Sequence, residues 1–206
     1  MLTVWIYRLD DFGSEVSNKL LELTPNVKYH HMATNPCVDM DASHFEETDV
    51  VVFISMRPRD EMFRQLNARC AESHCTFLPV FIELGLLRVG PLVQVPRTPC
   101  WECWRERERA NHPLVHSRDS LLRYYGTDIA KSPRGYMPYI VDLAACKVAD
   151  ILLSKSSYDA QLGKVWAINI WNRHISMEPF VERHACPHCG SEDTNSTIGC
   201  LIDYCR

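Results

Sequence analysis

The sequence predicts an α/β fold with a doubly wound, mostly parallel sheet, and three features of its first part indicate this. First, short apolar stretches of β-prone residues recur along the chain. Second, the segments between them carry apolar residues at helical spacing. Third, Asp49–Ser55 is an almost unbroken apolar run, as expected of a strand buried on both faces of a parallel sheet. Strands that alternate with helices favour the doubly wound arrangement.

The first part of the chain supplies the parallel strands and the helices that cross between them. The strands are expected at Thr3–Tyr7, Val27–Met32, Asp49–Ser55 and Thr76–Ile82. The helices are expected at Phe12–Leu23 and Arg59–Ser73. Pro79 lacks a backbone N–H, so it predicts either an edge position or a bulge for the strand that contains it.

The second part of the chain is less regular. A small hairpin is expected at Leu84–Pro99, and a loop-rich excursion at Ser117–Pro138. Helices are predicted at Trp104–Leu114 and Tyr139–Lys155, and a strand at Lys164–Trp171 that can pair with Arg173–Arg183. We expect one domain over residues 1–190, with its metal-binding subregion at about 84–116 and 164–190, and a polar tail at 191–206.

Composition and charge argue against nucleic acid and membrane as partners. The net charge is −4, and no block of like charge exceeds a few residues. The alternating run Arg105–Arg109 is expected to be a solvated helix face. No N-terminal signal peptide is recognisable, and no apolar run approaches the roughly 20 residues that span a bilayer. These features predict a cytoplasmic protein, in which ten cysteines point to thiols and metal ligands rather than disulfides.

Two Cys-x-x-Cys pairs predict a structural zinc site. The pairs are Cys100 with Cys103 and Cys186 with Cys189, and proline and glycine residues shape both turns. Zinc prefers four tetrahedral ligands, and four thiolates leave no open position for a catalytic water. Because the pairs lie far apart in the chain, the site is expected to clasp distant segments together.

Other interpretations of these cysteines stay open at this point. One Cys-x-x-Cys pair could be a redox pair, although a thioredoxin-like motif would not need a second copy. His184 and His188 flank the second pair and could replace a cysteine as ligands. The remaining cysteines are more typical of buried apolar positions or of exposed tail thiols.

Several motifs resemble the ubiquitin-activating-type, or ThiF-like, adenylating proteins, whose sheet is Rossmann-like. The match includes Phe12-Gly13-Ser14-Glu15-Val16 and the Arg-x-x-Leu-Asn-x-x-Cys pattern from Arg64 through Asn67 to Cys70. The segments Gly90–Trp104 and Arg183–Gly190 are similar to a narrower branch of that family. This branch contains the ThiF-like cyclodehydratase partner proteins of thiazole/oxazole-modified microcin biosynthesis, which makes azole-containing ribosomal peptides. The likeness runs from about residue 3 to residue 190.

The resemblance also implies that the nucleotide site is degenerate. ThiF-like enzymes bind ATP phosphates with a glycine-rich turn, which Arg8-Leu9-Asp10-Asp11-Phe12-Gly13 replaces here, and only Gly13 is kept. A carboxylate about 4 Å from a phosphate charge costs roughly 4 kcal/mol, or about a thousandfold in affinity. Met56 stands where the family places a magnesium-binding aspartate. Arg64 and Asn67 are the residual matches, and helix structure explains them equally well.

The resemblance therefore implies a non-catalytic scaffold in an azoline-forming cyclodehydratase complex, with structural zinc as its cofactor. Its expected partners are a precursor peptide, a YcaO-type enzyme and other pathway subunits, and a homodimer is left open. Longer relatives carry an N-terminal winged-helix-like module that binds the leader peptide, whereas the sheet is expected to begin at Thr3. Leader capture would then fall to another subunit or to an edge strand, with Thr76–Ile82 and Lys164–Trp171 as candidates. Two alternatives remain: an active ATP-dependent adenylating enzyme, and a zinc-containing interaction module unrelated to peptide modification.

Overall fold

A computed structural model describes residues 2–33, 45, 48–126 and 135–190, so the predicted tail lies outside the described residues. Its strands are β1 (Thr3–Arg8), β2 (Lys28–Ala33), β3 (Val50–Ser55), β4 (Thr76–Glu83), β5 (Leu86–Val89), β6 (Lys164–Asn169) and β7 (Ile175–Pro179). Its helices are α1 (Asp11–Leu23), α2 (Asp60–Glu72), α3 (Trp101–Asn111), α4 (Val115–Gly126), α5 (Pro138–Leu153) and α6 (Lys155–Gln161). The protein is thus a mixed α/β structure, as the sequence predicts.

The strands form one sheet in the order β2-β1-β3-β4-β5-β6-β7. The pairs β1–β2, β1–β3 and β3–β4 are parallel, and β5, β6 and β7 continue the sheet with antiparallel pairings. Every residue of β3 is buried, in agreement with its unbroken apolar sequence. The predicted strands of the first part are therefore confirmed. The hairpin expected within Leu84–Pro99 needs correction, because β5 forms its hairpin with β4, which precedes Leu84, and not with a later part of that segment.

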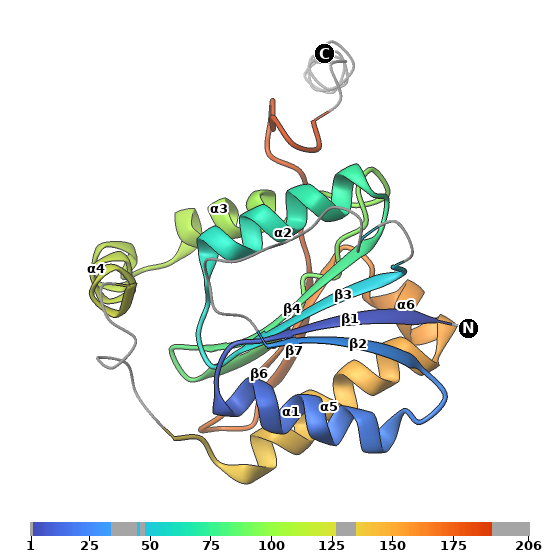
Figure 1. Ribbon diagram of the computed structural model, residues 1–206. Coiled ribbons are helices and arrows are strands. Elements are labelled where there is room, and N and C mark those ends of the chain that lie inside the picture. The colour runs from blue at the N-terminus through green and yellow to red at the C-terminus, as the bar shows by residue number, and fades with distance from the viewer. Residues whose placement is uncertain (1, 34–44, 46–47, 127–134, 191–206) are drawn as a thin grey trace.

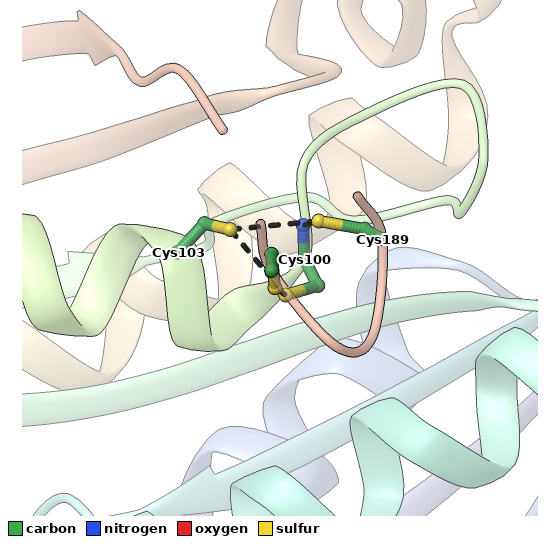
Figure 2. A group of neighbouring side chains, drawn as sticks. Cys100, Cys103 and Cys189 are labelled. Carbon is green, nitrogen blue, oxygen red and sulfur yellow. Dashed lines mark hydrogen bonds between the residues drawn. The ribbon is translucent and has the colours of Figure 1, made fainter. Parts of the chain in front are cut away.

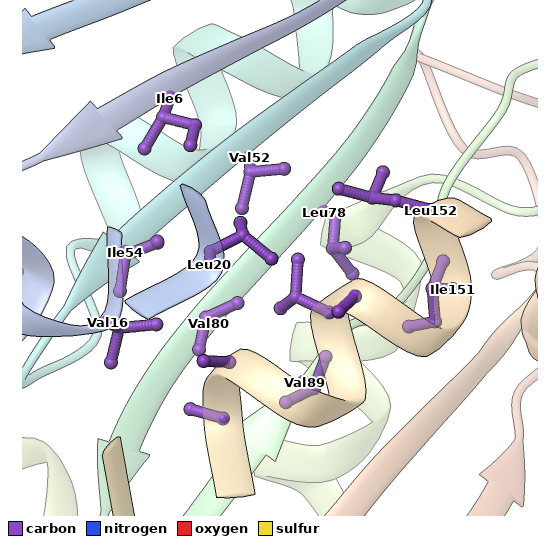
Figure 3. Close-up of a cluster of buried hydrophobic side chains, with 14 of the residues drawn as sticks. Ile6, Val16, Leu20, Val52, Ile54, Leu78, Val80, Val89, Ile151 and Leu152 are labelled. Carbon is purple, nitrogen blue, oxygen red and sulfur yellow. The ribbon is translucent and has the colours of Figure 1, made fainter. Parts of the chain in front are cut away.

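Helices cover both faces of the sheet (Figure 1). On one face α1 and α5 pack against an aliphatic core, whose side chains point from the strands toward these two helices (Figure 3). On the other face α2 and α3 cover an aromatic cluster centred on Phe63, which lies between the rings of Phe53, Phe77, Phe81 and Trp101 at 5.1–6.1 Å between centroids. Trp101 begins α3, so this cluster fixes the start of that helix.

Pro79 marks a bulge and not an edge. β4 lies inside the sheet between β3 and β5, so the alternative of an edge strand is wrong. Val80 pairs with Val89, and Phe77 forms a bridge with Val93. Three residues therefore separate the two pairings along β4, whereas four separate them along the segment that follows β5. The ladder is therefore interrupted at Pro79, where the missing N–H needs no partner.

The strands nominated as edges are both internal. β4 and β6 each pair on two sides, whereas the edges of the described sheet are β2 and β7. The predicted pairing of Arg173–Arg183 with β6 is confirmed over β7. None of the helices in the described part of the chain has the length and apolar character needed to cross a bilayer.

Two helical predictions need correction. The segment Ser117–Pro138 is expected to be a loop, but its first part belongs to α4. A salt bridge explains the difference, because the buried Arg118 of α4 reaches Glu83 at the end of β4, a contact that local sequence cannot reveal. The helix predicted at Trp104–Leu114 begins earlier, at Trp101, and ends at Asn111. The short helix α6 has no counterpart among the predicted elements.

Candidate metal centre

The four predicted cysteine ligands come together in space. Their sulfur atoms all lie within 4.8 Å of one another. The Sγ atom of Cys100 is 3.7 Å from that of Cys103 and 3.6 Å from that of Cys186, and the Sγ atoms of Cys103 and Cys189 are 3.5 Å apart. Cys100, Cys103 and Cys186 are buried, and Cys189 is partly buried. Figure 2 shows the side chains of Cys100, Cys103 and Cys189 converging from α3 and from the C-terminal segment.

Local structure holds each cysteine pair in a tight turn. Cys100 is the N-cap of α3, and its C=O accepts the N–H of Cys103 at 3.1 Å. In the second turn the N–H of Gly190 donates to the C=O of Cys186 at 2.9 Å. A Cβ atom at Gly190 would lie 2.5 Å from that same oxygen, so the turn closes only around glycine. Gly190 therefore has the shaping role that the sequence predicts for it.

Backbone amides cross between the two segments to the sulfur atoms. The N–H of Cys100 donates to the Sγ of Cys189 at 3.2 Å, and the N–H of Arg183 donates to the Sγ of Cys103 at 3.2 Å. Such bonds favour the thiolate form of a cysteine. They also make each turn dependent on the other, although more than 80 residues separate them in sequence.

The electrostatics of the cluster suit a bound cation. Burial raises the pKa of the Cys189 thiol to about 12 and raises that of Cys100 further. Burial also acts to raise the pKa of Cys186. Hydrogen bonds from the backbone N–H groups of His188 and Cys189 outweigh this effect and lower the pKa to about 7. Four thiolates this close together repel one another unless a positive ion lies between them.

The spacing of the sulfurs fits a divalent metal. A tetrahedral zinc with Zn–S bonds of about 2.3 Å separates its sulfur ligands by about 3.8 Å. The three S–S separations given above, 3.5–3.7 Å, are close to this value and too long for disulfide bonds. The cluster can therefore hold a metal ion, and its four sulfur donors are those that zinc prefers.

Charged side chains surround the cluster but do not enter it. His188 donates from Nε2 to Glu102 at 2.7 Å, and Arg64 pairs with the same carboxylate. His188 thus contacts Glu102 beside the sulfurs, and neither His188 nor His184 is among the residues of the cluster. The Glu102 bond is the main reason that the pKa of Arg64 is raised above its ordinary value.

Asn67 supports the same turn from α2. Its Oδ1 accepts the backbone N–H of Trp101 at 3.1 Å, within a buried environment. Arg64 and Asn67, which match the family's nucleotide-site pattern in sequence, therefore both contact the beginning of α3. In this structure Arg64 pairs with Glu102 and Asn67 binds the backbone of Trp101, and both partners lie beside the cysteines.

Replacing Asn67 with alanine should weaken the fold around the cysteine cluster. The change leaves the buried N–H of Trp101 without an acceptor, which costs about 1–3 kcal/mol. We expect this loss in the free energy of unfolding, measured by urea titration followed by tryptophan fluorescence. Asn111→Ala at the exposed end of α3 is the matched control, and equal stability of the two variants would contradict the assignment.

The predicted nucleotide turn is arranged around Asp10. Its Oδ1 accepts the N–H of Gly13 at 2.9 Å, and its Oδ2 accepts the N–H of Met56 at 2.7 Å. Asp10 is thereby the N-cap of α1 and connects the β1–α1 turn to the end of β3. Asp11 begins the helix and is exposed. Gly13 is required for packing, because a Cβ atom there would lie 2.6 Å from the C=O of Ile54 and 3.3 Å from the Cβ of Arg8.

Sequence reasoning missed a buried ion cluster beside this turn. Glu83, at the end of β4, accepts from Arg105 on α3 and from Arg118 on α4 at 2.9–3.1 Å. Arg105 also bonds Asp60 at 3.0 Å. The prediction of a solvated face at Arg105–Arg109 is therefore wrong for Arg105, which is 6% exposed. The alternating charges gave no local signal that one of them pairs with a carboxylate in the sheet.

An apolar cavity of 510 Å³ lies at the carboxyl ends of β3 and β4. Glu83 and Arg57 are among its lining residues, but most of its wall is apolar and includes Tyr125, Tyr136 and Trp171. In open α/β sheets, ligands bind outside this edge of the strands. A polyphosphate would find few partners in so apolar a cavity.

The comparisons place the fold among known structures. No family model matches the sequence, and no curated protein matches it. Among solved structures, a heterocyclase in complex with substrate and cofactor shares 18% identity at a TM-score of 0.63, over 91% of this chain and 25% of its own. The heterocyclase TruD shares 17% identity at a TM-score of 0.64, over 91% of this chain and 27% of its own.

Two further neighbours come from microcin biosynthesis. E. coli MccB, solved with succinimide, has 13% identity and a TM-score of 0.64, over 92% of this chain and 67% of its own. A chain of the E. coli microcin synthetase McbBCD complex has 14% identity and a TM-score of 0.64, over 90% of this chain and 67% of its own. The chain thus spans about a quarter of the first two neighbours. It shares the fold of heterocyclases and microcin synthetases.

Proposed function

We propose that this chain is a non-catalytic subunit of an azoline-forming, peptide-modifying complex, in which it positions a precursor peptide or a YcaO-type cyclodehydratase. The proposal treats residues 1–190 as one ThiF-like domain with a doubly wound, Rossmann-like sheet. Support comes from the shared fold of neighbours described as heterocyclases and microcin synthetases. The observation that supports a scaffold over an enzyme is the position of Asp10.

Asp10 occupies the place where an anion would bind. The N-terminus of a helix after the first strand of such a sheet is a ready anion site, because its N–H groups are free and its dipole is positive. Here the Asp10 carboxylate already accepts the N–H groups of Gly13 and Met56. A phosphate would have to displace this carboxylate and also meet its charge. Met56 adds no hard oxygen ligand for magnesium.

We assign the cysteine cluster to one zinc ion with a structural role. Cys100, Cys103, Cys186 and Cys189 would hold it, and the ion would join the start of α3 to the C-terminal segment. The four sulfur donors leave no coordination position for a substrate. The chain's own residues keep the ligands in place. Backbone N–H groups donate hydrogen bonds to two of the sulfur atoms, and Asn67 and Glu102 contact the residues beside the cluster.

Calorimetric titration with ATP and magnesium tests the scaffold assignment. We expect no binding in the micromolar range, because Asp10 blocks the anion site. The control is a double variant, Asp10→Gly with Asp11→Gly, examined in an ATPase assay. It should still give no ATP turnover, because Met56 is unchanged. Micromolar binding by the unmodified chain, or turnover by the double variant, would favour the alternative of an active adenylating enzyme.

Copurification with the products of neighbouring genes tests the partners. We expect the chain to retain a precursor peptide or a YcaO-type enzyme and to raise the rate of azoline formation when added to that enzyme. If it binds zinc but changes neither the binding nor the rate, the remaining alternative is a zinc-containing interaction module unrelated to peptide modification.

A further inference from the structure

The outer side of β7 presents a row of backbone groups that face away from the sheet. The N–H of Asn169 donates to the C=O of His174 at 2.9 Å, and the N–H of Phe180 donates to the C=O of Gly163 at 3.3 Å. Hydrogen bonds alternate along an antiparallel pair, so His174, Ser176 and Glu178 direct their backbone groups toward β6. Ile175 and Met177 therefore direct theirs outward, where no described strand pairs with them.

The same strand exposes apolar side chains on one face of the sheet. Ile175 is 54% exposed and Met177 is 47% exposed, although both belong to a strand. They lie opposite Ile168 and Trp166 of β6. Outward N–H groups beside exposed apolar side chains make an edge that can pair with a further strand.

We propose that the partner of this edge is β7 of a second copy of the chain, paired antiparallel about a two-fold axis at Ser176. Ile175 then lies opposite Met177 of the second copy, and Met177 opposite its Ile175. Each outward N–H meets an outward C=O, which gives four hydrogen bonds from two identical strands. A two-fold interface requires such self-complementarity. The inference goes beyond the proposed function and does not depend on it.

The positions of His174 and Glu178 favour this register over its neighbours, because an imidazole N–H can donate to a carboxylate across the interface. His174 and Glu178, which line the groove on the other face of the sheet, come to lie opposite each other across the axis, once on each side. A register shifted toward Pro179 places Ile175 against a residue with no N–H and separates His174 from Glu178. A register shifted the other way pairs Met177 with Arg173, which lies in the hairpin turn with φ 59° and donates its N–H to Asn169.

The apolar face also continues across the axis. The pair Ile168–Ile175 of one copy meets the pair Met177–Trp166 of the other, so that the exposed side chains become neighbours in one stripe. Cross-strand contacts of this kind stabilise sheets. A foreign peptide strand would satisfy the backbone groups equally well, but it would have no reason to match the positions of His174 and Glu178.

Sedimentation of the full chain over a wide range of concentration tests the dimer. Met177→Pro removes an outward N–H without breaking the ladder to β6, a place where an edge strand tolerates proline. Because two of the four hydrogen bonds are lost, we expect dimerisation at least about tenfold weaker. Met177→Val keeps the N–H and should still dimerise. A chain that stays monomeric throughout, or equal dimerisation of the two variants, would overturn the proposal.

A cross-link tests the register. Ser176 lies on the axis in a non-hydrogen-bonded pair, where Cα atoms are about 4.5 Å apart, within the range of a disulfide. In a background with Cys37, Cys146, Cys200 and Cys205 replaced by serine, Ser176→Cys should give a disulfide-linked dimer on mild oxidation, seen by intact mass. Glu178→Cys in the same background is the control, because it faces His174 and not itself. Equal yields from the two variants would show that the strands do not pair in this register.

Discussion

Cys100→Ser should release the bound metal and lower the free energy of unfolding by several kcal/mol, because metal binding at a site that joins distant segments is folding free energy. Cys189→Ser should do the same from the other segment. The two changes together should cost little more than either alone, since the site is already lost in each single variant. Zinc content by elemental analysis and urea unfolding of the purified chain measure these outcomes.

The control for the cysteine variants is Cys146→Ser on the exposed side of α5. It should keep about one equivalent of zinc and unfold like the original chain, within about 0.5 kcal/mol. Purified protein with less than half an equivalent of zinc would contradict the metal assignment. So would Cys100→Ser protein that unfolds at the same urea concentration as the control.

Glu83→Gln should be strongly destabilising, by about 3–5 kcal/mol. The side chain of Glu83 is 2% exposed, as is that of its partner Arg118, and that of Arg105 is 7% exposed. Without the Glu83 charge, Arg88, Arg105 and Arg118 are opposed only by Asp60 and Glu108, so one positive charge of this buried cluster is left without a counterion. Urea unfolding measures the loss, and Glu72→Gln, which breaks an exposed ion pair with Arg69, should cost less than about 1 kcal/mol.

The same variant has a defined pH dependence. Burial acts to raise the pKa of Glu83, but the ion pairs with Arg105 and Arg118 outweigh it and lower the pKa below its ordinary value. A lowered folded-state pKa gives stability that is present above the unfolded-state pKa, about 4.3, and is lost as the pH falls through the folded value. The difference in stability between the original chain and Glu83→Gln should therefore narrow in acid. If the difference in unfolding free energy between the two proteins stayed constant from neutral to acidic pH, the ion-pair explanation would be contradicted.

Local sequence was sufficient for much of the fold because apolar periodicity reports burial directly. The runs that became β1, β3 and β4 are buried along their length or on alternate sides, and α1 and α5 carry apolar faces that pack on the same core. Local sequence patterns did not predict elements whose stability depends on contacts with residues distant in sequence. α4 depends on the salt bridge between Arg118 and Glu83, and neither residue stands out in its own segment.

At the cysteine cluster, too, local sequence predicted some features and long-range contacts explain the others. The Cys-x-x-Cys spacing predicted which four residues come together, because each turn by itself brings two sulfurs to adjacent corners of a tetrahedron. The roles of Arg64 and Asn67 could not be read in this way. Both match a nucleotide-site pattern, yet their side chains contact Glu102 and Trp101 on another helix.

The amino-acid pattern alone was enough to predict the alternation of strands and helices, the association of the four cysteines and the acidic character of the first turn. All of these depend on residues close together in the chain or on the ligand chemistry of sulfur. The folded structure was needed to show that Asp10 caps α1 and reaches Met56, that Glu83 binds two arginines, and that β7 is an edge of the described sheet. These features join residues that are distant in sequence, and their energy comes from burial and charge that exist only once the chain has folded.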